Sequence, residues 1–477
     1  MSTYESPPTV GLFAIGLDTY WDQFEGLRER LDGYRTRVRD GLEERGAEVI
    51  DAGLVDTVEK AAEAGRRFKE EDVSLVFLYV STYALSETVL PVVRKAGAPV
   101  VVLNLQPTAA VDYEAINQMK DRIDKTGEWL ANCQACAVPE IASVFNRAQI
   151  DFYQVTGTLE DEEAWAEIED WLEAARVSGV MQRNRLGIMG HYYSGMLDIY
   201  SDPTQHAAFF GSHIELLEVD DLRVRREEVT APDTERKIEE IHEEFDVSEE
   251  CPDDEIERAA RTACALDALV EDKRLGSLAY YYEGAEGSVN EELMGSVIVG
   301  TSIITGRGVP VSGECDVKNA QAMKIMDAFR AGGSFTEFYS MDFEDGVVLM
   351  GHDGPGHIKI AEGKPKLKPL RLYHGKPSHG LSIEMSVANG PVTVLSVVQT
   401  HDGQLKLLVS EGKAVSGPIL EIGNTNSRYQ FPIGVKEYVE TWNSHGPAHH
   451  CAVGVGHIAS RIQKLGALLD MEVAQVC

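Results

Sequence analysis

Two glutamates and three histidines in the last third of the chain have the residue types of a metal-dependent active site. Glu314 and Glu337 each stand in a short segment near glycine, and His352 and the pair His449-His450 follow further along. Two carboxylates and two imidazoles from separate segments supply the mixed oxygen and nitrogen ligands that one divalent cation can take. We therefore expect these segments to meet in an enzyme site.

The residues alone leave open which histidines face the ion. His352 and His357 both belong to the glycine-rich turn that follows the apolar run Val347 to Met350. Neighbouring residues of an extended segment point to opposite sides, so at most one of His449 and His450 should face a given ion.

The two glutamates are predicted to lie at one edge of a sheet. Glu314 stands between the strand-like run Val309 to Ser312 and a helix predicted over Val317 to Arg330. In open α/β sheets, ligands bind outside the carboxyl ends of strands, where such junctions gather. Glu337 follows that helix and a Gly332-Gly333 turn, which returns the chain to the same edge. In the plainer interpretation, Glu314 caps the helix and Glu337 is an exposed strand residue.

Composition excludes several classes of protein. The chain has 477 residues and a formal charge of -34, which argues against a nucleic-acid or anionic-membrane binder, because either needs a basic face. Seven cysteines do not form a disulfide framework in a chain of this length. The first residues lack a signal peptide, and apolar runs stay well short of the roughly 20 residues of a membrane helix. We expect a cytoplasmic protein of about three domains.

The first two thirds of the chain alternate apolar runs with amphipathic stretches, which is typical of doubly wound parallel sheets. Predicted strands are Val10 to Ile15, Val49-Ile50, Ser74 to Val80, Pro99 to Leu105, Phe152 to Thr156, Leu186 to Met189, Ile214 to Val219 and Leu278 to Tyr282. Predicted helices are 22–45, 57–71, 86–96, 160–176, 233–245, 253–271 and 317–330.

The last third has the alternating pattern of antiparallel strands, as in Val392 to Val398 and Gln404 to Val409, and ends in a helical stretch, Ile458 to Leu469. The predicted fold is α/β, with two consecutive doubly wound parallel-sheet lobes followed by a mostly antiparallel β domain. The expected domains are 1–182, 183–332 and 333–477.

Other motifs give weaker signals. The glycine motifs of dinucleotide and phosphate-loop sites are absent. Cys133 and Cys136 have metal or redox spacing, but no second pair accompanies them, so a structural or pocket-lining role is expected. The run Tyr280-Tyr281-Tyr282 ends a strand and has either a core role or a sugar-contacting one.

Four segments, in order, resemble motifs of the L-arabinose isomerase family. The segment Gly308 to Ala320 resembles the family's G-x-G-E-x-D-x-K-x-A, and Phe335 to Tyr339 is similar to F-M-E-D-Y. Val348 to His352 resembles L-V-L-G-S-H, and Gly446 to His450 resembles G-G-A-H-H. A weaker resemblance extends through the N-terminal lobes, so that it covers nearly the whole chain.

The resemblance implies a Mn²⁺ ion bound by Glu314, Glu337, His352 and His450, with His449 beside it. Family members interconvert an aldose and a ketose through a cis-enediol: a glutamate moves a proton between C2 and C1, while the metal polarises O1 and O2. Glu314 and Glu337 would be the catalytic residues. The family forms trimers and hexamers with active sites between subunits, so the resemblance implies a homo-oligomer that acts on a small sugar.

Two segments depart from the family pattern. Asn132 to Ala137 puts Cys136 where the family's N-Q-T-A-H-G has a substrate-contacting histidine, and Leu17 to Asp22 replaces S-Q-H-L-Y-G. A thiol cannot repeat the paired donor and acceptor of imidazole, so we expect the sugar to differ from arabinose. The expected substrate contacts are Asp18, Tyr20, Cys136, Met196, Tyr282 and His449.

Two alternatives remain at this point. The same metal site would serve an epimerase or a lyase, because an enediolate can be reprotonated or can eliminate. Two α/β lobes also describe non-catalytic sugar-binding proteins, although the third domain with its acid and histidine motifs counts against that interpretation.

Overall fold

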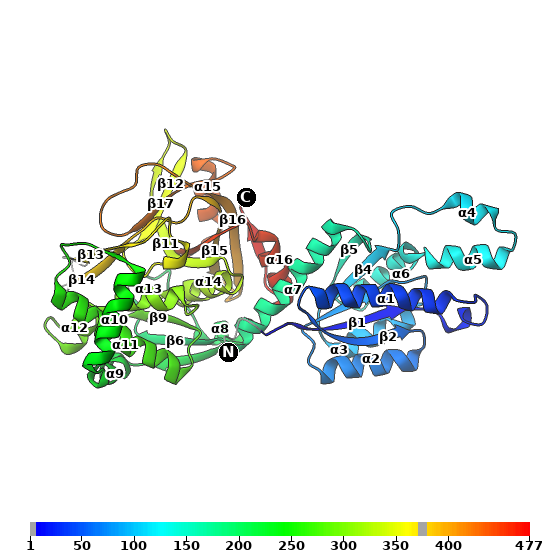
Figure 1. Ribbon diagram of the computed structural model, residues 1–477, viewed down its shortest axis with the longest axis horizontal. Helices are drawn as coiled ribbons and strands as arrows, with labels where there is room; N and C mark the ends of the chain where they lie inside the picture. The colour runs from blue at the N-terminus through cyan, green and yellow to red at the C-terminus, as the bar shows by residue number, and fades with distance from the viewer. Residues whose placement is uncertain (1–5, 371–378) are drawn as a thin grey trace. The chain divides into compact units, whose positions relative to one another are not determined.

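The computed structural model describes residues 6–370 and 379–477 (Figure 1). The chain forms two compact units, Met1–Gly179 and Val180–Cys477. Helix α7 (Glu162–Arg183) continues seven residues beyond the predicted end at residue 176. The division into three domains at the predicted boundaries stays a prediction.

The N-terminal unit contains a parallel sheet of five strands in the order β2-β1-β3-β4-β5. Its strands are β1 (Thr9–Ile15), β2 (Glu48–Val55), β3 (Leu75–Tyr79), β4 (Val100–Gln106) and β5 (Phe152–Thr158). The predicted parallel sheet is confirmed. The strand order reverses between β1 and β3, so the crevice at their carboxyl ends is the switch point of this sheet.

Helices of the N-terminal unit begin and end close to the predicted residues in some cases only. They are α1 (Leu27–Glu44), α2 (Val58–Glu70), α3 (Leu90–Ala96), α4 (Tyr113–Gln118), α5 (Arg122–Ala131), α6 (Gln134–Arg147) and α7. The stretch predicted as one helix over 86–96 is a 3₁₀ turn, Ser86–Thr88, followed by α3. Pro91 explains the break, because proline fits the first turn of a helix and not its interior. Helices α4 to α6 were not predicted.

The C-terminal unit begins with a second parallel sheet, in the order β10-β9-β6-β7. Its strands are β6 (Arg185–Gly190), β7 (His213–Leu217), β9 (Ser277–Tyr281) and β10 (Val311–Ser312). The associated helices are α8 (Pro203–Phe210), α9 (Val219–Glu228), α10 (Ala231–Glu244), α11 (Asp253–Lys273), α12 (Val289–Met294), α13 (Val297–Gly306) and α14 (Val317–Ala328). This confirms the second predicted lobe, whose strand order reverses between β6 and β9.

A mostly antiparallel sheet follows in the same unit, as predicted, in the order β15-β18-β11-β12-β17-β16-β19. Its strands are β11 (Gly332–Asp342), β12 (Val347–His352), β15 (Gly390–Gln399), β16 (Leu405–Val415), β17 (Thr425–Gln430), β18 (His450–Val455) and β19 (Val473–Gln475). An additional pairing joins β15 to β16, so six strands close into a ring without a free edge. In Figure 1 these strands lie above α13 and α14.

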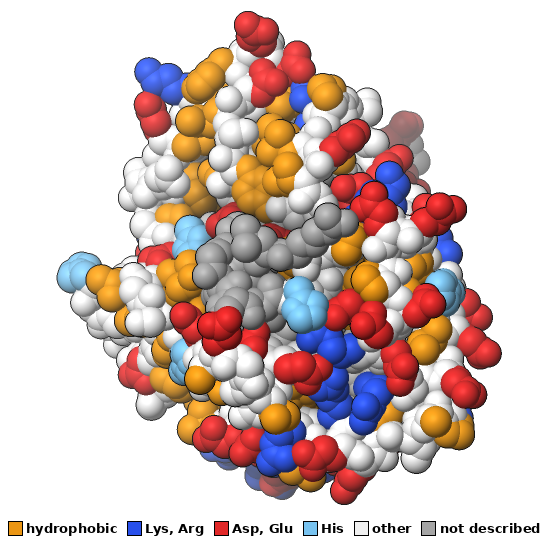
Figure 2. Space-filling view, turned by 90° about the vertical axis from the view of Figure 1, so that its left-hand side faces the viewer, with side chains coloured by type: hydrophobic (Ala, Val, Ile, Leu, Met, Phe, Trp, Pro, Cys, Tyr) orange, Lys and Arg blue, Asp and Glu red, His pale blue; other side chains and the backbone are white. Residues whose placement is uncertain are grey.

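Smaller elements complete the C-terminal unit. Strands β8 (Asp246–Val247), β13 (Lys366–Leu370) and β14 (Gly380–Glu384) form a three-stranded sheet, and the helices α15 (Val435–Ser444) and α16 (Ala459–Leu468) accompany the ring. Within the described ranges, no helix has both the length and the apolar character that crossing a membrane demands. Acidic side chains are spread over the face shown in Figure 2, in keeping with the net charge of -34.

Candidate metal centre

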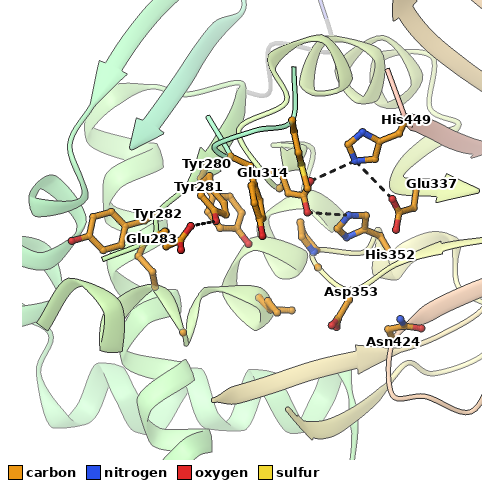
Figure 3. Close-up of a pocket in the computed structure, with 18 of the residues that line it drawn as sticks. Tyr280, Tyr281, Tyr282, Glu283, Glu314, Glu337, His352, Asp353, Asn424 and His449 are labelled. Atoms are coloured by element: carbon orange, nitrogen blue, oxygen red, sulfur yellow. Dashed lines mark hydrogen bonds and ion pairs between the residues drawn. The ribbon is translucent and has the colours of Figure 1, made fainter. Parts of the chain in front are cut away.

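A cavity of about 680 Å³ opens in the C-terminal unit at the carboxyl ends of β6, β9 and β10 (Figure 3). Strands β11 and β12 and His449, the residue before β18, form its opposite wall. The parallel sheet therefore presents its switch-point edge to one end of the antiparallel ring, and the cavity lies between them.

Glu314 enters this cavity from a sharp turn between β10 and α14. Glu314 and Cys315 both have left-handed backbone, with φ values of 55° and 61°. For residues with a side chain this conformation costs about 1–3 kcal/mol each, and such strain is retained mainly at functional sites. Backbone hydrogen bonds hold the turn: Cys315 donates to Tyr280 (2.8 Å), and Tyr193 donates to Glu314 (3.3 Å).

Asp316, and not Glu314, caps helix α14. One oxygen of its carboxylate accepts the backbone N–H of Asn319 at 3.1 Å. The capping role that the plainer interpretation gave to Glu314 therefore belongs to its neighbour, and the Glu314 carboxylate remains available to the cavity.

Register in the antiparallel ring brings the other candidates together. Glu337 on β11 pairs with His450 on β18 and, on its other side, with Gly351 on β12. Directly opposite residues of antiparallel strands project from the same face. The carboxylate of Glu337 and the imidazole of His450 therefore share the face that borders the cavity, with His352 at the end of β12.

Two carboxylates and three imidazoles converge at this end of the cavity. Figure 3 shows four of them, Glu314, Glu337, His352 and His449. Glu314 Oε2 lies 3.3 Å from His450 Nε2 and 3.6 Å from His449 Nε2. Glu314 Oε1 lies 4.0 Å from His352 Nε2, and Glu337 Oε2 lies 3.8 Å from His449 Nε2. Ligand atoms fall within 4.8 Å of one another in two groups, Glu314 with His449 and His450, and Glu337 with His352 and His450.

Both members of the histidine pair approach Glu314, which differs from the expected alternation. His449 precedes β18, which begins at His450, so the two residues do not share extended backbone. Their rings lie 3.8 Å apart between centroids. His357 lies elsewhere, with Nε2 at 3.9 Å from the carboxylate of Asp327, so the geometry favours His352 for the cluster.

Two further carboxylates, which sequence reasoning missed, support the histidine pair from behind. Asp316 Oδ2 lies 3.0 Å from His450 Nδ1, and both side chains are fully buried. Asp198 Oδ2 lies 2.6 Å from His449 Nδ1. Asp316 stands two residues after Glu314, in the segment that resembles the family, whereas Asp198 stands in a loop without a signal of its own.

The charges of the site stabilise one another. Burial opposes the charged form of Glu314, but the neighbouring imidazoles of His449 and His450 outweigh it and hold the pKa of Glu314 well below its usual range. Burial likewise opposes protonation of His450, but Asp316 and Glu314 raise its pKa to about 9. Without a bound cation, this end of the cavity therefore keeps a proton on His450.

The donor set fits a divalent metal ion. In the described part of the chain, two buried atoms that face each other, Glu314 Oε2 and His450 Nε2, lack a hydrogen-bond partner. Adjacent ligands of one ion with bonds of roughly 2.0–2.2 Å lie about 3 Å apart, close to the observed 3.3 Å. Asp316 behind His450 is the carboxylate–histidine arrangement that orients metal-binding imidazoles.

Comparisons with known proteins agree with the motifs. The family model of the L-arabinose isomerase C-terminal domain matches residues 332–472. An L-arabinose isomerase of Nocardioides sp. is 23% identical over 352 residues, which cover 71% of this chain and 68% of that protein. The L-arabinose isomerase of Aeromonas salmonicida is 23% identical over 309 residues, covering 62% of this chain and 61% of that protein. Residues 332–472 of this chain therefore match the L-arabinose isomerase C-terminal domain, and the chain is distantly similar to L-arabinose isomerases.

One solved structure carries no weight beside these relatives. The ADP-heptose LPS heptosyltransferase II of E. coli aligns over 64% of this chain and 84% of that one, at 11% identity. Its TM-score of 0.13 is too low to support an argument about fold or activity.

Aromatic side chains line the wall of the cavity that lies across from the metal cluster. Met196 and Tyr282, two of the predicted substrate contacts, line the same cavity as the metal cluster. Tyr281 donates its hydroxyl to Glu283 at 2.9 Å, and its ring stacks on Tyr193 with centroids 4.6 Å apart. These contacts hold the Tyr281 ring in place; Figure 3 shows Tyr281 beside Glu283.

Three other predicted contacts belong to the N-terminal unit. Asp18 and Tyr20 form a 3₁₀ turn directly after β1, and Cys136 is exposed in the first turn of α6. Burial raises the pKa of Tyr20, and Tyr83, Cys133 and Cys136 add to that increase, so these groups are near neighbours. Their contribution to a sugar site stays a prediction.

Proposed function

We propose that this protein is a metal-dependent aldose-ketose isomerase. The observation that carries the proposal is the convergence of Glu314, Glu337 and three imidazoles at one end of a cavity large enough for a sugar. The relatives support it, since both are named L-arabinose isomerases. Because the matches span only about two thirds of those proteins, activity and substrate belong to the proposal.

Four residues would hold the ion: Glu314, Glu337, His352 and His450. Their mixed carboxylate and imidazole set suits Mn²⁺ or a similar divalent ion. Such an ion, when bound, polarises the oxygens at C1 and C2 of the sugar and stabilises the negative charge of the enediolate.

The surroundings of the two glutamates suit them to different roles in the reaction. His449 and His450 stabilise the ionised form of Glu314, so this carboxylate stays negatively charged and is a weak base. Glu337 sits further from these rings, with Oε2 at 3.8 Å from His449 Nε2, and about a third of its side chain is exposed to the cavity. We assign to Glu337 the removal of the proton from C2 of the sugar and its return to C1. We assign to Glu314 the positioning of the C1–C2 end of the sugar.

The remaining contacts would define the sugar. His449 stands between the two carboxylates, and Met196 and Tyr282 border the space in which the far end of the sugar lies. We propose that Asp18, Tyr20 and Cys136 contribute as well, in a homo-oligomer whose sites lie between subunits. Because Cys136 offers a thiol where the family pattern has imidazole, we expect a preferred sugar other than L-arabinose.

A proton-exchange experiment tests this function. The purified protein is dialysed against EDTA, restored with Mn²⁺, and incubated with pentoses, hexoses and 6-deoxyhexoses in deuterated water. We expect deuterium at the exchanging carbon of one sugar class, together with the matching ketose, only after metal is restored and not in Glu337→Gln.

Other results of this experiment would indicate a different function. An epimerase would give a second aldose, a lyase would give shorter fragments, and a sugar-binding protein would show saturation without exchange. Absence of exchange with every sugar, in a protein that retains Mn²⁺, would refute the isomerase.

A further inference from the structure

The loop that follows β6 places one carboxylate directly behind His449. Asp198 Oδ2 accepts the backbone N–H of His449 at 3.0 Å and lies 2.6 Å from Nδ1 of the same residue. The two residues are 251 positions apart in the chain. One oxygen therefore contacts both the backbone and the ring of His449, which restrains rotation of the imidazole.

The loop itself is held in place from helix α14. The ammonium group of Lys318, which is buried, donates to the backbone oxygen of Asp198. Lys318 stands two residues after Asp316, whose carboxylate contacts His450. The first turn of α14 thus supports both imidazoles, His450 directly through Asp316 and His449 through the Asp198 loop.

We propose that Asp198 is a positioning residue: it keeps a proton on Nδ1 of His449 and turns Nε2 toward the gap between Glu314 and Glu337. An ionised carboxylate can only accept hydrogen bonds, so the hydrogen that joins it to the ring must sit on Nδ1. Nε2 then faces Glu314 Oε2 at 3.6 Å and Glu337 Oε2 at 3.8 Å (Figure 3).

Electrostatics agree with an ionised Asp198. Burial opposes its charge, but hydrogen bonds from the ring and backbone of His449 outweigh burial and lower the pKa of Asp198. An asparagine in its place has the same shape but can present its NH₂ group to Nδ1. The proton of a neutral imidazole then moves to Nε2, or the ring turns away from the site.

The test compares Asp198→Asn with a matched control, Asp202→Asn. Asp202 stands nearby and caps α8 by accepting the backbone N–H of Thr204 at 2.8 Å. Asparagine caps helices about as well as aspartate, so the control variant should fold and act as the wild type does.

The first measurement needs no substrate. In ¹⁵N-histidine-labelled protein, we expect a hydrogen-bonded Nδ1–H resonance that is absent from His449→Gln, retained in Asp202→Asn and lost in Asp198→Asn. A resonance unchanged in Asp198→Asn, at an unchanged melting temperature, would overturn the positioning role.

The second measurement rests on the proposed function. With the sugar that the exchange screen identifies, kcat/KM should fall about 10- to 100-fold in Asp198→Asn and stay within about twofold of wild type in Asp202→Asn. Equal values for wild type and Asp198→Asn would also overturn the role. If the wild type acts on no sugar, the isomerase proposal fails and the NMR result alone decides for or against Asp198.

Discussion

Asp316→Asn should change both the strength and the pH dependence of metal binding. Asp316 has two contacts: one oxygen caps α14, and the other lies 3.0 Å from His450 Nδ1. Asparagine preserves the cap and the volume but removes the negative charge behind the ring. The substitution therefore isolates the electrostatic support of His450 from the local fold.

The magnitude follows from the proton that the ion must displace. With the pKa of His450 near 9, binding at pH 7 releases a proton at a cost of about two pKa units, or about 2.7 kcal/mol. Wild-type affinity should therefore rise about tenfold per pH unit from 7 to 9 and then level off. In Asp316→Asn the pKa of His450 falls, so the affinity for Mn²⁺ levels off at a lower pH. Loss of the carboxylate that orients His450 also weakens this maximal affinity about 10- to 100-fold.

The metal-free protein should show the opposite trend in stability. Because the folded-state pKa of His450 is raised, its ion pairs contribute fully below the unfolded pKa of about 6.5 and are lost as pH rises through about 9. The change is about 3 kcal/mol for this group.

Isothermal titration calorimetry with Mn²⁺ under argon at pH 7, 8 and 9 measures the affinity of each protein for the ion. Thermal melts in EDTA measure the stability of the metal-free protein. Asp202→Asn, which alters another helix cap of the same unit, serves as the control. A wild-type affinity that stays constant from pH 7 to 9, or an Asp316→Asn curve parallel to the wild type, would refute this reasoning.

Three further results are expected. Glu314→Gln and Glu337→Gln should each abolish turnover while thermal melts stay near wild type, since both carboxylates face the cavity; wild-type rates in either variant would remove that glutamate from the mechanism. His450→Ala should retain less Mn²⁺ than His449→Ala, because the former is fully buried against a carboxylate, and elemental analysis showing equal content would contradict this. Gly351→Ala should destabilise the protein by at least about 3 kcal/mol in denaturant unfolding, because an added Cβ would collide with the backbone of β17; a smaller loss would mean that the strands separate easily.

Much of the fold follows from local pattern. The runs Val10 to Ile15 and Leu278 to Tyr282 are continuous and apolar because their strands are covered on both faces, and the structure places a buried parallel strand at each. One helix that is buried all round escaped the same reasoning. α13 is apolar on every side, so it lacks the polar face that marks a surface helix.

The residue types predicted the chemistry of the site, but the sequence did not predict its geometry. Glu314 was expected at the carboxyl end of a strand because an apolar run precedes it and a helical pattern follows. The chain itself therefore specified the kind of ligands and the edge of the sheet from which one of them projects.

Only the tertiary structure decided which atoms meet. The pairing of Glu337 with His450 depends on the register between β11 and β18, and the approach of His449 to Glu314 depends on the residue at which β18 begins. The contact of Asp198 with His449 joins segments with no local relation in sequence. Hydrophobic periodicity reports the face that a residue occupies within its own element, whereas distances between elements are set by how those elements pack.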